Sequence, residues 1–536
     1  MVVVAIVLSP LIVIFYESGN LSYDRWATLW SASIPELLWK TVKLALLVAF
    51  FTVIMGVSVA WLVTRRRFKG RTLVIWLMVM PLAIPTYVYA DIYMQLFSDK
   101  GWLGWFATFW NDTVLTSSLI QGLSSIWSWL TGDSATLYEF TSLLSVAFVL
   151  SFASFSYVFL LVRTSLGKST QSLEEAARIQ GANAQRVFWK INFPLMRPAI
   201  AASMAIVILH TISDFGAVSK LQYSTFTQAI YTQYMRNSSD LGMPAALSMV
   251  LVVMAMTFLI VERFFRSRQQ YYSSDKEIEQ KDLKPLHGIE KIIVWGWIGL
   301  IGLFAVGLPV GWILVQSFKA LIHGQIGWVL WNNTVSSFAV AAAAATLALI
   351  AAFPIAYFHS RRKTFLSATC MHASNVGFVL PGPIIALGAL IIGAFIFDGV
   401  TTFAYFFIWI AAITIRYLPL AVQSQESLLQ QLTPSIEQAG RILGATPWEN
   451  FKRVILPVIK PGMISAWVLV FIDALKELPA ALLLRPQGTT TLPVMIWAEE
   501  NEEMLEATAP ASLMLILATL PAIWLMMRGQ KLRKDS

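Results

Sequence analysis

The chain has 536 residues, of which 57% are apolar and only 13% are charged. Soluble domains are about 45–50% apolar and about 25% charged, so this chain has too little polar surface to fold as water-soluble domains. A membrane-spanning helix takes about 20 apolar residues, so the length accommodates a dozen spans with their loops and excludes a large soluble catalytic domain. The single cysteine, Cys370, excludes an intrachain disulfide and lies in an apolar stretch, where its expected role is to fill space.

Apolar runs long enough to cross a bilayer recur twelve times, which predicts an all-α, polytopic membrane protein. The runs form two sets of six. The first set is 1–17, 38–63, 72–96, 139–162, 198–218 and 243–261, and the second is 291–317, 332–358, 372–397, 400–421, 461–484 and 507–527. The Trp-rich region 99–138 is broken by Gly, Asp and Asn, and we interpret it as interfacial rather than spanning.

This pattern predicts a first module over 1–261, a polar linker over 262–290 and a second module over 291–536. The first apolar run begins at Met1 with no charge ahead of it, so it also resembles the core of a signal peptide. Because no small-residue cleavage pattern followed by a soluble domain is present, an uncleaved first helix is preferred.

The net charge of +9 is concentrated in loops that follow even-numbered spans. These segments hold 29 of the 39 Lys and Arg residues: 65–71, 163–197, 262–291, 361–363, 422–460 and 528–536. By the positive-inside rule they lie in the cytoplasm, which also places both termini there. Basic loops beside anionic membrane lipid account for the charge, so nucleic acid is not needed as a partner.

A duplicated segment lies in the longest cytoplasmic loop of each half, between the fourth and fifth spans. A shift of 263 positions aligns 172–200 with 435–463, and ten of these 29 positions are identical. Agreement in both sequence and place indicates an internal duplication, with the two six-helix repeats parallel in the membrane.

Each copy is predicted to form a helix, a break and a second helix. A capping-box spacing opens the first helix, a glycine ends it, and a polar residue caps the second helix. A proline is then expected to limit the second helix. In chain order these residues are Ser172, Glu175, Gly181, Asn183 and Pro194 in the first copy, and Ser435, Gln438, Gly444, Thr446, Pro447, Glu449 and Pro457 in the second.

The duplicated segment resembles the E-A-A-x(3)-G-x(9)-I-x-L-P loop of permease subunits of bacterial ABC importers. The first copy matches at Glu175, Ala176, Ala177, Gly181, Ile191 and Pro194, with Phe193 in place of Leu. The second copy keeps Gly444, Leu456 and Pro457, but it has Gln438, Gly440 and Val454 at the Glu, second Ala and Ile positions. Glu437 can substitute for the missing carboxylate one position earlier.

The resemblance implies a fused two-module permease with the type I ABC importer transmembrane fold, in the bacterial cytoplasmic (inner) membrane. It implies that 172–183 and 435–446 are coupling helices that dock on a homodimeric ABC ATPase, which holds the ATP and Mg. An extracytoplasmic substrate-binding protein is the other implied partner, and this chain binds no cofactor and has no catalytic residue. The implied coupling residues are Glu174, Glu175, Ala176, Ala177 and Gly181, with Glu437, Gln438, Ala439, Gly440 and Gly444.

The chain itself has no nucleotide-binding motif. Gly167, Lys168 and Ser169 look like the end of a phosphate-binding loop, but the earlier glycine that the motif requires is replaced by Val162. An ion-driven secondary transporter is the alternative in another class, although its repeats are more often inverted. A membrane scaffold without transport is disfavoured, because a scaffold has no use for duplicated coupling loops.

Two carboxylates at equivalent positions are candidates for the translocation path. The 263-residue shift carries Asp214 onto Glu477, and oxygen ligands suit a hard metal cation. The structural alternative ties Asp214 to Lys220, and Glu477 to Lys476 or Arg485. Arg416 and Asp91 are further buried candidates without symmetric mates, and the five histidines show no metal-ligand spacing, so the metal ligands are unknown.

Four segments resemble ferric-iron importer permeases, and the resemblance extends over nearly the whole chain. The segments are 80–93, 210–221, 225–231 and 473–486. The resemblance implies ferric iron as cargo. Similar fused permeases for thiamine and phosphonates, and single-module relatives for polyamines and sulfate, remain alternatives.

Overall fold

The protein is described from a computed structural model. The described residues are 2–98, 101–104, 125, 137–167, 174, 177–237, 240–267, 284–396, 402–431, 438, 440, 442, 444–501 and 508–521. Most of the predicted interfacial region 99–138 lies outside them.

Helices make up almost all of the described structure, as the composition predicts. The exception within the described ranges is one parallel pairing of two short strands, β1 (Arg66–Arg67) and β2 (Lys284–Pro285). The pairing joins the end of the predicted linker to the loop after α3 (Ile34–Arg65). The all-α class is therefore confirmed.

The predicted spans correspond to apolar helices in the described part of the chain. Seven helices are long and apolar enough to cross a membrane by length and composition, and two bent pairs raise the number to nine. The bent pairs are Val3–Gly19 with Tyr23–Ala32, at 101°, and Arg71–Ala83 with Thr86–Phe97, at 99°. Three shorter apolar helices, Gly382–Ile396, Gly462–Leu475 and Thr508–Pro521, occupy the remaining predicted positions.

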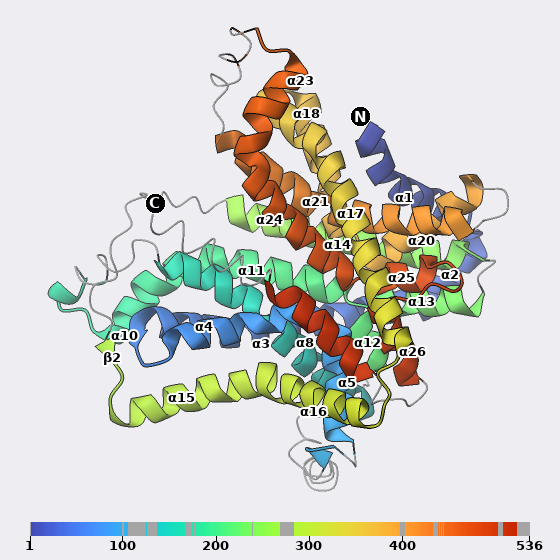
Figure 1. Cartoon of the computed structure of the whole chain (residues 1–536). Coiled ribbons are helices and arrows are strands. Elements are labelled where there is room, and N and C mark those ends of the chain that lie inside the picture. Colours follow the sequence, from blue (N-terminus) through green and yellow to red (C-terminus); the bar gives the residue numbers. More distant parts are fainter. Residues whose placement is uncertain are drawn as a thin grey trace. The chain divides into compact units, whose positions relative to one another are not determined.

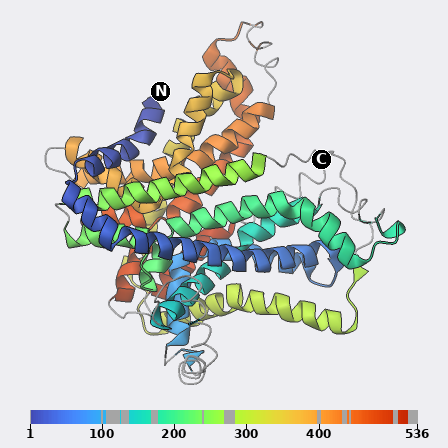
Figure 2. The ribbon, with the colours of Figure 1, turned by 180° about the vertical axis from the view of Figure 1, so that it is seen from behind.

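The chain divides into two compact units, each described here by itself. The N-unit comprises Ala32–Gln228 and Val253–Val315. Its centre is formed by α3, α8 (Leu137–Gly167) and α11 (Phe193–Ser213), which pack on one another (Figures 1 and 2). Around them are α4 (Arg71–Val79), η1 (Met80–Ala83), α5 (Thr86–Phe97), α10 (Ala184–Val187), η3 (Phe188–Asn192), α12 (Gly216–Lys220), the start of α13 (Phe226–Arg236), the second half of α14 (Gly242–Ser267), α15 (Gly288–Gly302), η4 (Leu303–Gly307) and the first half of α16 (Leu308–Ile322).

The C-unit comprises Met1–Ser31, Ala229–Val252 and Gln316–Ser536. Its centre is the group α17 (Trp328–Arg361), α21 (Thr402–Gln431) and α24 (Leu456–Leu475), which run side by side (Figure 1). Its other elements are α1 (Val2–Gly19), α2 (Tyr23–Ala32), the rest of α13, the first part of α14, the second half of α16, α18 (Phe365–Ser374), α19 (Val376–Val379), α20 (Gly382–Ile396), α23 (Pro447–Asn450), η5 (Phe451–Ile455), α25 (Pro479–Leu484) and α26 (Leu492–Asn501).

The compact units divide the chain differently from the predicted modules. The first span, α1, packs on α20 within the C-unit, whereas α15 packs on α3 and α4 within the N-unit. The module boundaries at 261 and 291 describe where the repeated sequence starts and ends, and they remain a prediction.

The third span of each half is broken at a proline. Ile84 before Pro85 and Leu380 before Pro381 both adopt extended backbone, with ψ of 120° and 124°. A residue before proline is pushed out of the helical region, so the helix stops and restarts. The restarted helices begin at Thr86 and Gly382.

The π-helical turn η4 shows how a wide turn is stabilised inside the N-unit. The N–H of Leu308 bonds to Leu303 and Pro309 has no N–H, so the carbonyls of Phe304 and Ala305 lose their usual helical donors. The hydroxyl of Tyr89 donates to the Ala305 carbonyl at 2.6 Å, and that of Tyr93 donates to the Phe304 carbonyl. Two buried tyrosines of α5 thus satisfy the carbonyls that the π turn releases.

Candidate functional site

The two predicted coupling loops are partly described. Glu175, Ala176, Glu437 and Ala439 lie outside the described residues, and so do the capping boxes predicted to open each first helix. The described members are Glu174, Ala177 and Gly181 in the first loop, and Gln438, Gly440 and Gly444 in the second.

The first helix of each loop ends at the predicted glycine. Gly181 and Gly444 have φ of +83° and +86°, a backbone conformation that L side chains rarely adopt. The N–H of Ala182 bonds to the Ala177 carbonyl at 3.0 Å and that of Gly181 to Arg178 at 2.9 Å, which is the Schellman pattern. In the second loop the N–H of Ala445 bonds to the Gly440 carbonyl at 3.1 Å. The predicted helix stops are confirmed.

The second helix of each loop begins at the predicted cap. The N–H of Arg186 donates to Asn183 Oδ1 at 2.8 Å. The N–H of Glu449 donates to Thr446 Oγ1 at 3.3 Å, and Glu449 Oε2 accepts the Thr446 N–H at 3.0 Å, which completes a capping box. The backbone hydrogen bond from Thr446, together with that from its hydroxyl, lowers the pKa of the Glu449 carboxyl below its ordinary value.

The expectation that Pro194 and Pro457 limit these second helices is wrong. In both halves the helix widens into a π turn just before the proline, η3 and η5, and continues as the fifth span. The wide turn places the N–H of Phe193 on Phe188 and that of Leu456 on Phe451, so that the proline ring is accommodated. Each loop is therefore joined to its fifth span without a break.

A buried ion pair holds the first helix of the first predicted coupling loop to the end of the second span. Arg65 Nη2 lies 2.6 Å from Glu174 Oε1, and the two side chains are only 11% and 8% exposed. Arg178 Nη2 approaches the other carboxylate oxygen of Glu174 at 3.7 Å. Glu174 therefore fixes the helix from within the permease. The sequence showed Arg65 as part of a basic segment, but no sequence pattern around Arg65 indicated that Glu174 would be its partner.

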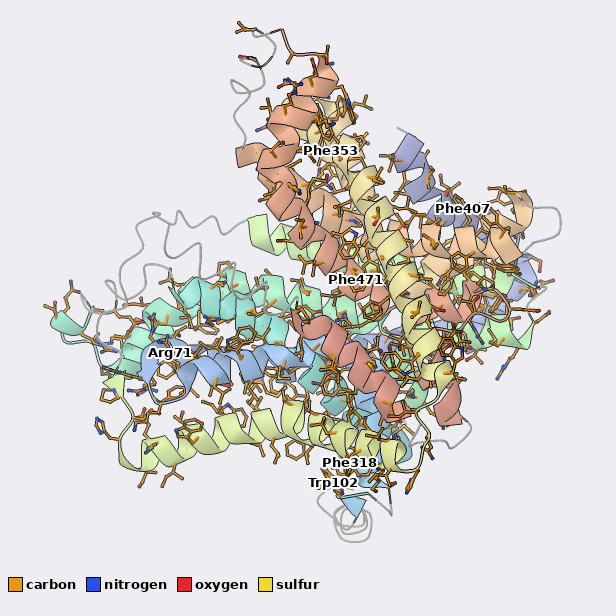
Figure 3. The ribbon with its side chains drawn as sticks, in the orientation of Figure 1. Arg71, Trp102, Phe318, Phe353, Phe407 and Phe471 are labelled. Atoms are coloured by element: carbon orange, nitrogen blue, oxygen red, sulfur yellow. The ribbon has the colours of Figure 1, made fainter. Side chains whose placement is uncertain are left out.

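The base of the second loop is an apolar core within the C-unit. Leu429, Ile455 and Ile459 are nearly fully buried there, with Phe353 and Phe451 packed against them. The rings of Phe353 and Phe451 meet edge to face at 4.9 Å, and Figure 3 labels Phe353 in this region.

Close packing explains why the second copy has glycine where the first has Ala177. A Cβ at Gly440 would lie 2.5 Å from Oδ1 of Asn450, a side chain that is 3% exposed. In the first copy the position equivalent to Asn450 is the buried Val187. The departure from the loop pattern at position 440 thus follows from a change in its packing neighbour.

Asp214 lies where the fifth span of the first half ends, and it begins the next helix. Its Oδ1 accepts the N–H groups of Ala217 and Val218 at 3.0 and 3.3 Å, so it caps α12. Its Oδ2 accepts the Thr86 hydroxyl at 2.5 Å. The side chain is buried, at 7% exposed, and Thr86 is a partner that the sequence did not indicate.

Glu477 has the same place and the same local role in the second half. Its Oε1 accepts the N–H of Ala480, three residues on, at 3.4 Å at the start of α25. Tyr417 donates its hydroxyl to Oε2 at 2.7 Å, and Arg416 Nη1 lies 3.3 Å from Oε1. The two partners considered for Glu477 in the structural alternative make other contacts: Lys476 lies 3.7 Å from Asp473, and Arg485 donates to Thr489 and Thr490.

The two halves stabilise these carboxylates by different means at equivalent positions. Thr86 and Gly382, which are 296 positions apart, each begin the helix that follows the break in the third span. The ends of α3 and α17, Arg65 and Arg361, are also 296 positions apart, so Thr86 and Gly382 are equivalent positions of the two halves. A Cβ at Gly382 would lie 1.7 Å from Arg416 Nη1 and 3.1 Å from Glu477 Oε1. Glycine thus leaves room for a guanidinium where the first half has a threonine hydroxyl.

The other candidates form no metal site in the described part of the chain. No group of three His, Cys, Asp or Glu side chains is placed to hold a metal ion there. Asp91 accepts a bond from Gln95 at 2.7 Å, and Gln95 in turn accepts from Trp312 at 2.6 Å, within the N-unit. Arg416, predicted as a buried candidate, is the cation beside Glu477.

The apolar helices and the capped loop ahead of the fifth span of each half define a two-module membrane protein. The comparison with known families agrees. The chain matches the family described as "Binding-protein-dependent transport system inner membrane component" twice, over residues 52–269 and 344–532, which together exceed half its length. The chain belongs to this family. It is a fused ABC importer permease of the inner membrane, and thus a transport component rather than an enzyme.

Individual relatives are similar over different shares of the chain. The Fe(3+)-transport system permease protein FbpB 2 of Haemophilus influenzae is 28% identical over 489 residues, which is 90% of this chain and 88% of the relative. The ferric transport system permease protein FbpB of Actinobacillus pleuropneumoniae is 25% identical over 66% of this chain and 53% of its own length. The sulfate transport system permease protein CysT of Escherichia coli is 28% identical over 48% of this chain and 84% of its own.

Proposed function

We propose that this chain is the permease of an ABC importer for ferric iron. The observation that carries the proposal is the similarity to a ferric-iron permease along 90% of this chain and 88% of the relative, because it includes both halves in one alignment. Sulfate is the second candidate. It is favoured by the sulfate permease relative, but that similarity extends over 48% of the chain.

Cargo uptake distinguishes the two candidates. A strain lacking this gene, and the same strain carrying it on a plasmid, are compared for uptake of radioactive ferric iron and of radioactive sulfate. Restored iron uptake with unchanged sulfate uptake is the expected result. Restored sulfate uptake alone would contradict the iron proposal and leave the permease assignment intact.

The proposed mechanism is alternating access driven by a separate ATPase. A loaded binding protein docks on the outer face, two identical ATPase subunits close on ATP, and both coupling loops move inward. The continuous helices Gln185–Ser213 and 447–475 support this coupling, because each fifth span starts directly at its loop. Displacement of a loop is therefore applied to the span itself.

The proposed orientation places the coupling loops and both termini in the cytoplasm, as the basic loops indicate. Labelling tests it in a Cys370→Ala background with single cysteines at Arg186, an exposed residue of the first loop, and at Tyr23, which is 85% exposed. A membrane-impermeant maleimide should label Tyr23→Cys in right-side-out vesicles and Arg186→Cys in inverted ones. The reverse pattern would contradict the orientation.

We also propose that Asp214 and Glu477 act on the translocation path through their charge and through the helices that they cap. Asp214→Asn separates these roles, because an asparagine still caps a helix but carries no charge, whereas Asp214→Ala removes both. If the charge attracts a cationic cargo, both variants lose iron uptake; if capping alone matters, only the alanine variant does. Normal uptake in both variants would refute any role in transport.

A further inference from the structure

Two arginines lie together at the end of the N-unit that carries the first predicted coupling loop. Arg71 begins α4 and Arg163 lies four residues before the end of α8, and these two helices pack on each other. The two guanidinium groups are close enough to repel each other. Arg71 Nε donates to the Val63 carbonyl at 2.6 Å, which holds its side chain in place, and Figure 3 labels Arg71 at the start of α4.

Arg163 has a buried donor without an acceptor in the described part of the chain. Its Nη1 is shielded from solvent and forms no hydrogen bond there. Two carboxylates at this end of the N-unit are paired with other arginines. Glu174 is paired with Arg65 at 2.6 Å, and Glu290 is paired with Arg66 at 2.5 Å. A buried cationic N–H group without an acceptor is costly, so an anion that binds beside Arg163 stabilises the N-unit.

The second half balances the charge at the equivalent place with its own side chains. By the shifts of 296 and 263 positions, residues 63, 71 and 163 correspond to His359, Ser367 and Glu426. His359 Nδ1 lies 3.3 Å from Ser367 Oγ, and His359 Nε2 lies 3.6 Å from Glu426 Oε1. The second half thus has a carboxylate where the first half has Arg163. The negative charge that the chain supplies in one half is replaced by a second positive charge in the other.

The place of the two arginines matches the level of lipid head groups. Arg71 begins one apolar stretch of the membrane and Arg163 lies near the end of another. Beside them Leu73 of α4 is 70% exposed, and Trp295 packs edge to face on Phe68 at 5.6 Å between ring centroids. Tryptophan is typical of the membrane–water interface, and an exposed leucine of a spanning segment meets lipid chains. A lipid whose chains lie along α4 therefore has its phosphate at the level of the arginines.

We propose that Arg71 and Arg163 bind the phosphate of an anionic phospholipid in the leaflet on the side of the predicted coupling loops. Phosphate oxygens match the planar fork of a guanidinium group and accept two hydrogen bonds from it. A zwitterionic lipid carries an ammonium that balances its own phosphate, so two adjacent cations favour a head group with a net negative charge. The bound lipid supplies to the first half the charge that Glu426 supplies to the second. This inference is independent of the cargo and of the ATPase.

Binding of a single lipid tests the site. Wild type, Arg163→Gln and Arg362→Gln are purified in detergent, stripped of lipid, titrated with phosphatidylglycerol and analysed by native mass spectrometry. Arg362→Gln is the matched control, because it removes the same charge from an exposed residue that follows α17. We expect Arg163→Gln to bind about tenfold more weakly and the control to match wild type. Equal affinities of all three proteins would overturn the proposal.

Charge reversal tests whether the lipid replaces a missing carboxylate. Arg163→Glu introduces the residue of the second half and places an anion beside Arg71. We expect its unfolding midpoint without lipid to be higher than that of lipid-free wild type. Phosphatidylglycerol should raise the midpoint of wild type and leave that of Arg163→Glu unchanged. A rise in Arg163→Glu as large as in wild type would overturn the proposal.

Two further ligands identify the source of the phosphate. Lipid-free wild type is heated with inorganic phosphate or with phosphatidylethanolamine, each at the concentration used for phosphatidylglycerol. We expect no rise in the unfolding midpoint with inorganic phosphate and a smaller rise with phosphatidylethanolamine. An equal rise with inorganic phosphate would refute a lipid as the ligand, and an equal rise with phosphatidylethanolamine would refute the requirement for a net negative head group.

Discussion

Gly382→Ala should destabilise the C-unit by disrupting the ion pair between Arg416 and Glu477. The new Cβ would lie 1.7 Å from Arg416 Nη1, whereas ordinary van der Waals contact begins at 3.4 Å. The guanidinium is the end of a flexible side chain, so it moves rather than the backbone. Moving it breaks the 3.3 Å contact with Glu477 and leaves a carboxylate that is 4% exposed without its cation.

The magnitude follows from what Glu477 keeps. Breaking a buried ion pair by removing one partner costs about 3–5 kcal/mol. Glu477 retains the Tyr417 hydroxyl at 2.7 Å and the Ala480 N–H at 3.4 Å, so we expect the lower end, about 3 kcal/mol. For a unit of this size each kcal/mol lowers the unfolding midpoint by about 2–4 °C, which predicts a fall of about 6–12 °C.

The protein contains its own reporter for this measurement. Cys370 in α18 is the single cysteine of the chain and is buried within the C-unit, so a fluorogenic thiol dye reports unfolding of that unit. Gly19→Ala is the matched control, because Gly19 ends α1 in the same unit and a Cβ there meets nothing within 4 Å. Equal midpoints for Gly382→Ala and Gly19→Ala would refute the reasoning.

A compensating variant tests the comparison between the halves. Gly382→Thr with Arg416→Ala introduces the threonine of the first half and removes the guanidinium that it would displace. We expect this double variant to be more stable than Gly382→Thr alone, because the threonine hydroxyl can then donate to Glu477. A double variant less stable than Gly382→Thr would show that the two arrangements are not interchangeable.

Three further predictions concern single contacts. Glu174→Gln leaves Arg65 buried beside a neutral partner and should cost about 3 kcal/mol locally, seen as faster hydrogen exchange over 177–181. Tyr89→Phe leaves the Ala305 carbonyl without its donor, which should cost about 1–3 kcal/mol and lower the unfolding midpoint. The pKa of Glu449 is lowered in the folded loop, so the stability that its cap contributes is fully present above the ordinary carboxyl pKa. That stability is lost as the pH falls through the pKa of the folded state. We therefore expect the Thr446 amide to exchange hydrogen faster in acid.

Each has a control of matched chemistry. Glu36→Gln removes a carboxylate that is 60% exposed in its pair with Lys40, and Tyr16→Phe removes the hydroxyl of a tyrosine that is 61% exposed. Effects equal to these controls would contradict the first two predictions. For the Glu449 prediction, Glu449→Gln should abolish the acid dependence of Thr446 amide exchange. If the exchange of that amide still accelerates in acid in this variant, another titrating group is responsible.

Features that depend on a few neighbouring residues could be predicted from the sequence. The stops at Gly181 and Gly444 and the cap at Thr446 are each determined within about five residues, and the structure confirms them. The spans could be predicted too, because each is a continuous apolar run. The proline rule failed at Pro194, because the helix widened into a π turn instead of ending.

The partners of the buried carboxylates could not be predicted. Asp214 meets Thr86 across 128 positions, and Glu477 meets Arg416 across 61. Packing of the third span against the end of the fifth span brings Thr86 to Asp214. In the second half, packing of the fourth span against the end of the fifth brings Arg416 to Glu477. The repeat gave the equivalence of Asp214 and Glu477, but it could not show that a threonine stabilises one and an arginine the other.

The geometry of the fifth spans connects the two ends of each repeat. At one end the loop is fixed by a helix stop and a cap, and in the first half also by the ion pair of Glu174 with Arg65. At the other end Asp214 or Glu477 caps the next short helix. Between them the helix is unbroken, because the π turn accommodates the proline that would otherwise interrupt it. A π turn shifts the helical register by one residue, about 100°, so it also sets the direction in which the loop projects from its span. The same turn at 188–192 and at 451–455 therefore gives both loops one orientation relative to their own spans.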